Sequence, residues 1–159
     1  MASQLEDRPP DWHRVAAAFD FWQENSDLLL VEGAGGWYVP IHPAPHDFMI
    51  ADLAAALRLP VVVVTDAVLG SINLSLLTVH AVREKNLAAV GIVINRVPPE
   101  GSRDLAMASN MGEIPRLSGV PLRAVLPETA ARPDPPPEVI VEALLPFARE
   151  WWTMVRADG

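Results

Sequence analysis

Three uninterrupted apolar runs constrain the fold of this chain more than any other feature. They cover residues 27–31, 60–65 and 89–95, and they consist mainly of leucine, valine and isoleucine. A strand with one face in water alternates polar and apolar residues, whereas a continuous apolar run is typical of a strand buried on both faces. These runs therefore predict buried, parallel strands. A fourth and weaker candidate covers residues 121–126.

Stretches with helical spacing of apolar residues separate the runs. They cover residues 12–23, 49–57, 72–84 and 104–117. Strands that alternate with helices of this length require crossover connections, which place helices on both faces of a parallel sheet. The pattern predicts an α/β fold with a parallel β-sheet between helices.

The last part of the chain has a different composition. Residues 132–137 hold four of the sixteen prolines and cannot form a helix or a central strand. An amphipathic helix is expected over 138–154, bent or interrupted at Pro146. With 159 residues, we expect one domain over 1–159, in which 132–159 form a proline-rich segment and a closing helix.

Composition disfavours several classes of protein. The net charge is −8 and no basic patch is present, which argues against nucleic-acid binding. The absence of cysteine excludes disulfides, thiolate metal sites and cysteine nucleophiles. The first ten residues show no secretory signal, and the apolar stretch at 59–64 is too short to cross a bilayer. We therefore expect a soluble, cytoplasmic protein without a membrane partner.

Candidate site residues follow the predicted strands, because ligands of open parallel sheets bind beyond the carboxyl ends of the strands. Glu32 follows the first run and precedes Gly33, Ala34 and Gly35. A carboxylate at the tip of a buried strand needs a partner, and Mg²⁺ shared with substrate phosphates would suit it. The glycines would let the backbone approach a ligand closely. A solvated strand-to-loop turn is the competing interpretation.

Two further segments follow the second and third runs. Gly70, Ser71, Ile72 and Asn73 begin a helix with Ser71 as the expected N-cap, and such a helix start suits a carboxylate or phosphate. Asn95 offers a donor and an acceptor, as reading a purine edge requires. A capped helix without a ligand and an ordinary turn are the competing interpretations.

Four blocks in this order resemble dethiobiotin synthetase, a family of the P-loop NTPase superfamily. They are VEGAGGWYVPI (31–41), DLAAALRLPVVVVTDAVLGSINLSLLT (52–78), GIVINRVPPEG (91–101) and LPE (126–128). VEGAGG also occurs in cobyrinic-acid amidating relatives, whereas LGSINLSLLT and INRVPP favour dethiobiotin synthetase. The resemblance implies synthesis of dethiobiotin from 7,8-diaminononanoate, CO₂ and ATP with Mg²⁺, in biotin biosynthesis. Such catalysis depends on positioning and on charge neutralisation around the phosphates.

The resemblance also implies roles for individual residues. Glu32 would bind Mg²⁺ and, together with the loop after it, ATP. The adenine would contact Asn95 and Arg96, and the loop beside the base would be formed by Pro127, Glu128 and Thr129. The helix start at 70–73 would receive the substrate's tail carboxylate in a neighbouring subunit, which implies a homodimer.

One part of the family pattern is not found in this sequence. The family opens with a strand and a GxxxxGK[ST] loop upstream of VEGAGG, and the chain contains no such motif. The P-loop lysine is absent with it, so no catalytic residue is assigned. Three hypotheses stay open: a fragment holding the C-terminal two-thirds of the fold, one half of an enzyme completed by a separate P-loop-bearing chain, or a non-catalytic binding domain or pseudoenzyme.

Overall fold

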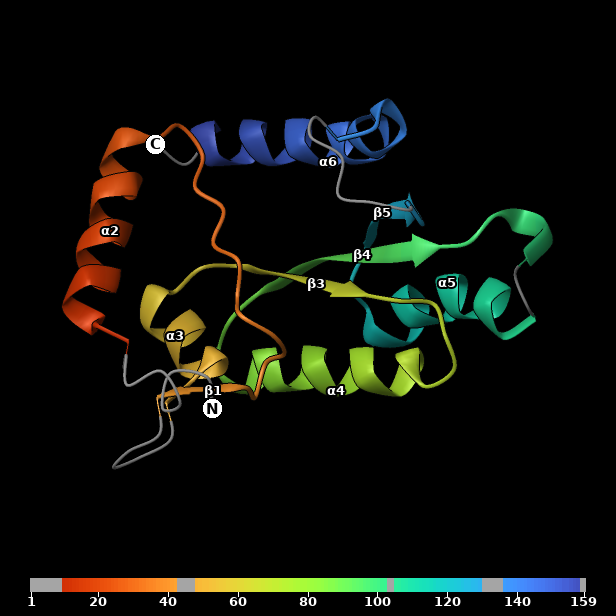
Figure 1. Cartoon of the computed structure of the whole chain (residues 1–159), viewed down its shortest axis with the longest axis horizontal. Helices are drawn as coiled ribbons and strands as arrows, with labels where there is room; N and C mark the ends of the chain where they lie inside the picture. Colours follow the sequence, from red (N-terminus) through yellow and green to blue (C-terminus); the bar gives the residue numbers. More distant parts are fainter. Residues whose placement is uncertain (1–9, 43–47, 103–104, 130–135, 158–159) are drawn as a thin grey trace. The chain divides into compact units, whose positions relative to one another are not determined.

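The computed structural model describes residues 10–42, 48–102, 105–129 and 136–157 (Figure 1). The chain divides into two compact units, Met1–Leu57 and Arg58–Gly159. The expected single domain over 1–159, with its separate tail at 132–159, stays a prediction.

The second unit contains a parallel three-stranded sheet. Its strands are β3 (Val61–Thr65), β4 (Ala89–Val97) and β5 (Leu122–Pro127), in the order β3-β4-β5. The helices of this unit are α4 (Ser71–Glu84), the 3₁₀ turn η1 (Glu100–Ser102), α5 (Leu105–Ser118) and α6 (Glu138–Ala157). Figure 1 shows α4 and α5 on one side of the sheet and α6 on the other. The predicted α/β class is therefore confirmed.

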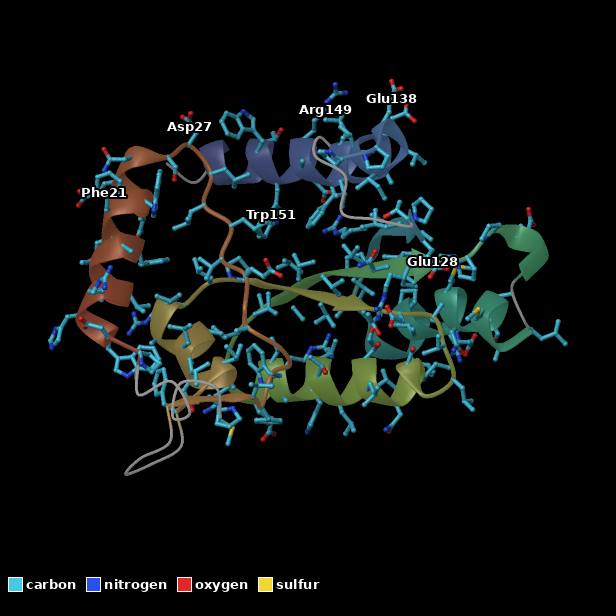
Figure 2. All side chains as sticks on the ribbon, in the orientation of Figure 1. Phe21, Asp27, Glu128, Glu138, Arg149 and Trp151 are labelled. Carbon is cyan, nitrogen blue, oxygen red and sulfur yellow. The ribbon has the colours of Figure 1, made fainter. Side chains whose placement is uncertain are left out.

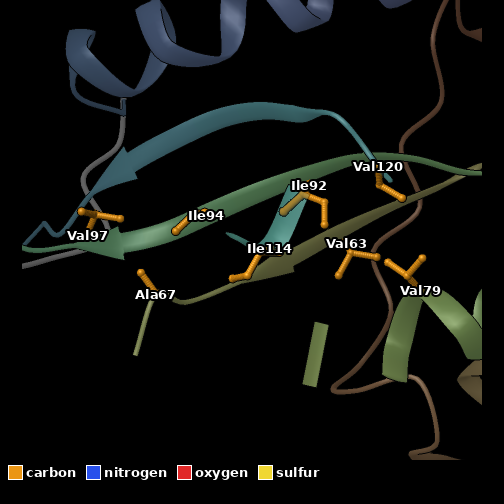
Figure 3. Close-up of a cluster of buried hydrophobic side chains, with 8 residues drawn as sticks. All are labelled: Val63, Ala67, Val79, Ile92, Ile94, Val97, Ile114 and Val120. Atoms are coloured by element: carbon orange, nitrogen blue, oxygen red, sulfur yellow. The ribbon is translucent and has the colours of Figure 1, made fainter. Parts of the chain in front are cut away.

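The core of this unit lies between the sheet and the α4–α5 layer (Figure 3). Ile92 and Ile94 on β4 pack with Val79 of α4 and Ile114 of α5, and all four are almost completely buried. Alternate residues of a strand face opposite sides of the sheet, so one face of β4 supplies this cluster. On this side the apolar run at 89–95 is buried as predicted.

Arg123 of β5 connects three elements of the second unit. Its Nε donates to the Val90 carbonyl at 3.1 Å, and its Nη1 donates to Glu150 of α6 at 2.7 Å. Its guanidinium lies over the Phe147 ring, 5.4 Å from the centroid. A β-carbon built on Gly91 would lie 2.5 Å from Arg123 Cγ, so Gly91 makes room for this side chain.

The first unit contains α2 (Trp12–Asn25), β1 (Pro40–His42), β2 (Phe48–Met49) and α3 (Ile50–Leu57). Asp11 caps α2, because its carboxylate accepts from the backbone N–H groups of His13 and Arg14. The short antiparallel pair β1–β2 was not predicted from the sequence. Strands of two and three residues are too short to show a periodic pattern.

The predicted strand at 27–31 is wrong. The segment forms no strand in the structure, and Leu30 is 80% exposed. Its apolar composition suits a buried strand, but a strand also needs a neighbour to complete its hydrogen bonds. No strand among the described residues pairs with it.

The remaining predicted elements agree with the structure to within a few residues. α6 continues across Pro146, so the predicted interruption does not occur. Proline removes one backbone donor, and the turns on either side of it remain helical. Asp104 and residues 132–135 of the proline-rich segment lie outside the described residues. β3 pairs only with β4 and is therefore an edge strand of the described sheet.

Candidate functional site

The carboxyl edge of the sheet in the second unit carries an ion pair between two strand ends. Asp66 follows β3, and Arg96 lies near the end of β4. The Nε of Arg96 lies 3.2 Å from Asp66 Oδ1, and its Nη2 lies 2.5 Å from Oδ2. This two-point hydrogen bond, together with the charge of Asp66, raises the pKa of Arg96 above its ordinary value. Arg96 is therefore a fixed cation, with 67% of its side chain exposed.

The backbone at Arg96 has an uncommon conformation. Its φ is +53°, and its N–H donates to the Asn95 side-chain carbonyl at 2.9 Å. A left-handed conformation costs a residue with a β-carbon about 1–2 kcal/mol. Such conformations cluster at functional sites, where the surrounding contacts hold them. Here Asp66 holds the guanidinium and Asn95 holds the amide.

The end of β4 lies directly beside the end of β5. Val97 is opposite Pro127 in the parallel register, and the Glu128 N–H donates to the Val97 carbonyl at 2.9 Å. Figure 2 labels Glu128 at this edge of the sheet. The structure thus brings the predicted Asn95–Arg96 segment together with Pro127, Glu128 and Thr129.

The helix start predicted at 70–73 lies at the same edge, where β3 leads into α4. The N-cap is Gly70, with φ +94°, and no side chain caps the helix. The expectation that Ser71 is the N-cap is wrong, because Ser71 is the first helical residue and only 3% exposed. A left-handed φ at this position suits glycine. Ile72 is half-buried and Asn73 is exposed.

The first turn of α4 leaves backbone donors available at this edge. The Ser71 N–H donates to the Val68 carbonyl. The first N–H that bonds within the helix is that of Leu74, which donates to Gly70, so the N–H groups of Ile72 and Asn73 have no acceptor within the helix. The positive end of the helix dipole lies at the same place. Such an arrangement suits a carboxylate or a phosphate.

Side chains fix the loop between β3 and α4. Asn110 of α5 donates to the carbonyls of Ala67 and Val68 at 2.8 and 3.0 Å. Thr65 Oγ1 donates to the Asp66 carbonyl at 3.3 Å and accepts from Ser75 at 3.1 Å. Three successive carbonyls of the loop therefore accept side-chain hydrogen bonds.

Sequence reasoning missed Asp66 and Asn110. Asp66 directly follows a predicted strand, so its position alone could have identified it. Asn110 lies inside a helix, 42 and 43 positions from the carbonyls that it binds, and no local pattern indicates it.

The glycine-rich loop belongs to the first unit. A β-carbon at Gly33 would lie 3.0 Å from Ile50 Cγ2, and one at Gly35 would lie 3.1 Å from Val39 Cγ2. Gly35 also has a φ of +92°. At the end of the loop the Val39 N–H donates to the Gly36 carbonyl at 3.0 Å, and the Val39 carbonyl accepts from the Ile50 N–H at 3.0 Å. Both positions therefore favour glycine, on either side of the exposed Ala34.

Glu32 is exposed, and its carboxylate has no hydrogen bond or ion pair with the described residues. Glu32 does not lie at the tip of a buried strand, as was predicted, because the preceding segment is not a strand, so its carboxylate needs no partner on that ground. The described residues contain no group of three or more His, Asp or Glu side chains that could hold a metal ion. A lone carboxylate fits Mg²⁺ only as one ligand beside substrate phosphates and water. Separately, none of the described helices is long and apolar enough to cross a membrane.

The sequence matches known proteins over most of its length. The profile of the family described as "AAA domain" matches residues 2–131, and the chain belongs to this family. Within it, the chain is homologous to enzymes named ATP-dependent dethiobiotin synthetase BioD. It is 36% identical to that of Akkermansia muciniphila over 77% of this chain and 55% of the relative.

Two further relatives carry the same name. Identity is 42% to the Anaeromyxobacter dehalogenans protein (strain 2CP-1), over 79% of this chain and 54% of the relative. It is 39% to the Saccharopolyspora erythraea protein, over 74% of this chain and 50% of the relative. The chain thus spans about half the length of the curated relatives that it matches.

Proposed function

We propose that this chain supplies the base-binding and substrate-carboxylate regions of an ATP-dependent dethiobiotin synthetase. The reaction would close the cyclic urea of dethiobiotin from 7,8-diaminononanoate, CO₂ and ATP, in the cytoplasm. The observation that carries the proposal is the joined end of β4 and β5 beside an uncapped helix start, all at one edge of the sheet. Similarity to relatives with that name supports it.

In this proposal the end of β4 reads the adenine. Asn95 presents a side-chain amide that can both donate to and accept from a purine edge. Arg96 stays cationic, and its hydrogen bonds to Asp66 restrict the rotation of its side chain. The loop at Pro127, Glu128 and Thr129 would flank the base, because Glu128 is hydrogen bonded to the end of β4.

Glu32 would supply one carboxylate to Mg²⁺. When bound, the ion would neutralise charge on the ATP phosphates. Gly33 and Gly35 carry no side chain, which would let the backbone beside Glu32 approach the nucleotide closely. The phosphate-binding loop that the printed sequence lacks would come from a separate P-loop-bearing chain or from a longer form of this protein.

The helix start at 70–73 would bind the tail carboxylate of the substrate through the backbone N–H groups of Ile72 and Asn73, since that of Ser71 is bonded to Val68. Leu69, Leu74 and Leu77 lie at and after this helix start and are 90%, 64% and 57% exposed. Exposed apolar side chains grouped on one element mark an interaction surface. We propose that they contact a second copy of this chain, so that the carboxylate site forms in a homodimer.

The proposal is tested by ADP formation. Purified chain is assayed with Mg·ATP, with and without an added P-loop-bearing chain, and each substrate is omitted in turn. We expect ADP only when 7,8-diaminononanoate and bicarbonate are both present. Glu32→Gln should lower the rate, whereas Glu24→Gln, at an exposed position in α2, should not. ADP release that needs no diaminononanoate would contradict the proposal.

Base recognition is tested separately by titrating Mg·ATP into the chain. Asn95→Ala removes hydrogen bonds to the base and should weaken affinity about tenfold. Asn25→Ala, whose side chain bonds only within α2, serves as the matched control. Equal affinities for Asn95→Ala and the unmodified chain would exclude this residue from the base site.

A non-catalytic dimerising domain is the second candidate, favoured by the exposed leucines of α4. It predicts a dimer in sedimentation experiments and no change in melting temperature with Mg·ATP. Leu74→Lys should weaken the dimer in either case, whereas Leu105→Lys, also highly exposed but on α5, should not. Stabilisation by Mg·ATP would favour the ligase over this candidate.

A further inference from the structure

The side chain of Asn110 is buried and connects α5 to the loop before α4. Asn110 is 6% exposed, although asparagine is among the residues usually found at the surface. Both hydrogens of its side-chain amide are used, one for the Ala67 carbonyl at 2.8 Å and one for the Val68 carbonyl at 3.0 Å. A buried polar group with two good bonds stabilises one arrangement of the segments that it joins.

The two carbonyls belong to the segment that sets the direction of α4. Val68 also accepts from Ser71 N–H at 3.1 Å, so one carbonyl joins Asn110 to the first helical residue. Gly70, between them, is left-handed at φ +94° and has no neighbouring atom within 4 Å of a β-carbon built on it. A side chain at position 70 would therefore meet open space, and the position of this turn is set by the backbone hydrogen bonds on both sides of Gly70, those to the Val68 carbonyl and to the Gly70 carbonyl itself.

We propose that Asn110 is a positioning residue for the carboxylate-binding start of α4. It holds the carbonyls of the loop inward, so that the free N–H groups of Ile72 and Asn73 keep a fixed direction towards a ligand. The inference rests on the proposed function for its ligand, the tail carboxylate of 7,8-diaminononanoate. It adds a residue from a different helix, one that would not itself touch the substrate.

Substitutions at two positions of α5, Asn110 and Ser118, distinguish an effect on the position of the α4 start from an effect on the stability of the whole fold. Asn110→Ala removes both long-range hydrogen bonds. Ser118→Ala removes a side chain that is equally buried but bonds only locally, to the Val120 N–H at 3.2 Å and the Pro115 carbonyl at 3.4 Å. Asn110→Asp keeps the shape of the side chain and places oxygens against both carbonyls. It should therefore have an effect at least as large as that of Asn110→Ala.

The first measurement is amide hydrogen exchange of the chain without ligand. In Asn110→Ala we expect exchange at Ser71 and Leu74 to accelerate about tenfold, while the amide of Val82, in the last turns of α4, changes no more than in Ser118→Ala. The second measurement is calorimetric titration with 7,8-diaminononanoate. Its affinity should fall about tenfold in Asn110→Ala and stay within about twofold in Ser118→Ala, with the affinity for Mg·ATP unchanged in both.

The outcomes are distinct. Unchanged exchange at Ser71 and Leu74 in Asn110→Ala would overturn the inference. Faster exchange with unchanged affinity for diaminononanoate would also overturn it, because Asn110 would then be structural only. If the unmodified chain, alone and with the P-loop-bearing chain, does not bind diaminononanoate at all, the carboxylate site of the proposed function fails and the inference fails with it.

Discussion

The contact between Gly91 and Arg123 allows a quantitative test of the packing in the second unit. Gly91→Ala would place a β-carbon 2.5 Å from Arg123 Cγ, closer than two carbons can lie. The Cγ atom is near the backbone and cannot swing away unless the whole side chain moves. Relief of the clash would therefore break the contacts of Arg123 with Val90, Glu150 and Phe147.

The expected cost follows from those contacts. A hydrogen bond from a charged group contributes about 1.5–3 kcal/mol, and a partly exposed cation–π contact contributes about 0.5–1 kcal/mol. The partly exposed ion pair with Glu150 adds at most about 1 kcal/mol. Replacing glycine in a strand with alanine returns about 0.5–1 kcal/mol. We therefore expect Gly91→Ala to lower the free energy of unfolding by about 1–4.5 kcal/mol.

Urea denaturation of a double-mutant cycle isolates this effect. In an Arg123→Ala background the obstacle is absent, so Gly91→Ala should stabilise by about 0.5–1 kcal/mol. The coupling free energy between the two positions should then be about 2–5 kcal/mol. If Gly91→Ala costs the same in both backgrounds, the side chain of Arg123 is not what requires glycine at position 91.

Three further predictions concern the same unit. Ile114→Ala should lower the free energy of unfolding by about 2–5 kcal/mol in urea, because this fully buried side chain would leave a cavity; a loss below 1 kcal/mol would contradict the core described here. Gly112→Ala, on the exposed side of α5, should stabilise the fold by about 0.5–1 kcal/mol, whereas Gly119→Ala, at φ +67°, should destabilise it by about 1 kcal/mol. Thermal melts should therefore show opposite shifts of the melting temperature for these two variants, and shifts of the same sign would contradict the prediction. Arg116 holds the pKa of Glu113 below its ordinary value of 4.5, so the pair stabilises the fold above that pH and the contribution is lost as the pH falls through the lowered pKa; NMR titration should show the pKa returning towards 4.5 in Arg116→Gln.

The sequence was sufficient to predict the strands and α-helices of the second unit, but not its 3₁₀ turn. Buried parallel strands are nearly continuous apolar runs, so β3 and β4 could be located to within two residues. The same rule failed at 27–31, where Leu28 and Leu30 have the composition of a strand but no strand among the described residues pairs with the segment. Apolar composition indicates that a segment tends to be buried. Whether it forms a strand also depends on a neighbouring strand that completes its backbone hydrogen bonds.

The sequence was sufficient to predict which edge of the sheet carries the candidate site, but not all of its residues or contacts. Reading the residues after each strand located Asn95 and the start of α4, and it could have included Asp66. The cap of α4 was misplaced by one residue, because the left-handed φ of Gly70 outweighs the usual preference for serine at that position. Asn110 was beyond reach, since its role depends on packing between segments more than 40 positions apart.

The edge position of β3 affects the handling of this protein. Four consecutive valines lie on a strand that has one unpaired edge among the described residues, and Val64 is 62% exposed. Such an edge is a template on which another extended chain can add. Pro60 precedes the valines and Asp66 follows them closely, as gatekeeper residues do around such segments. We therefore expect Asp66 to limit aggregation as well as to hold Arg96. Any variant that neutralises it should be assayed for soluble yield before a loss of binding is assigned to the site.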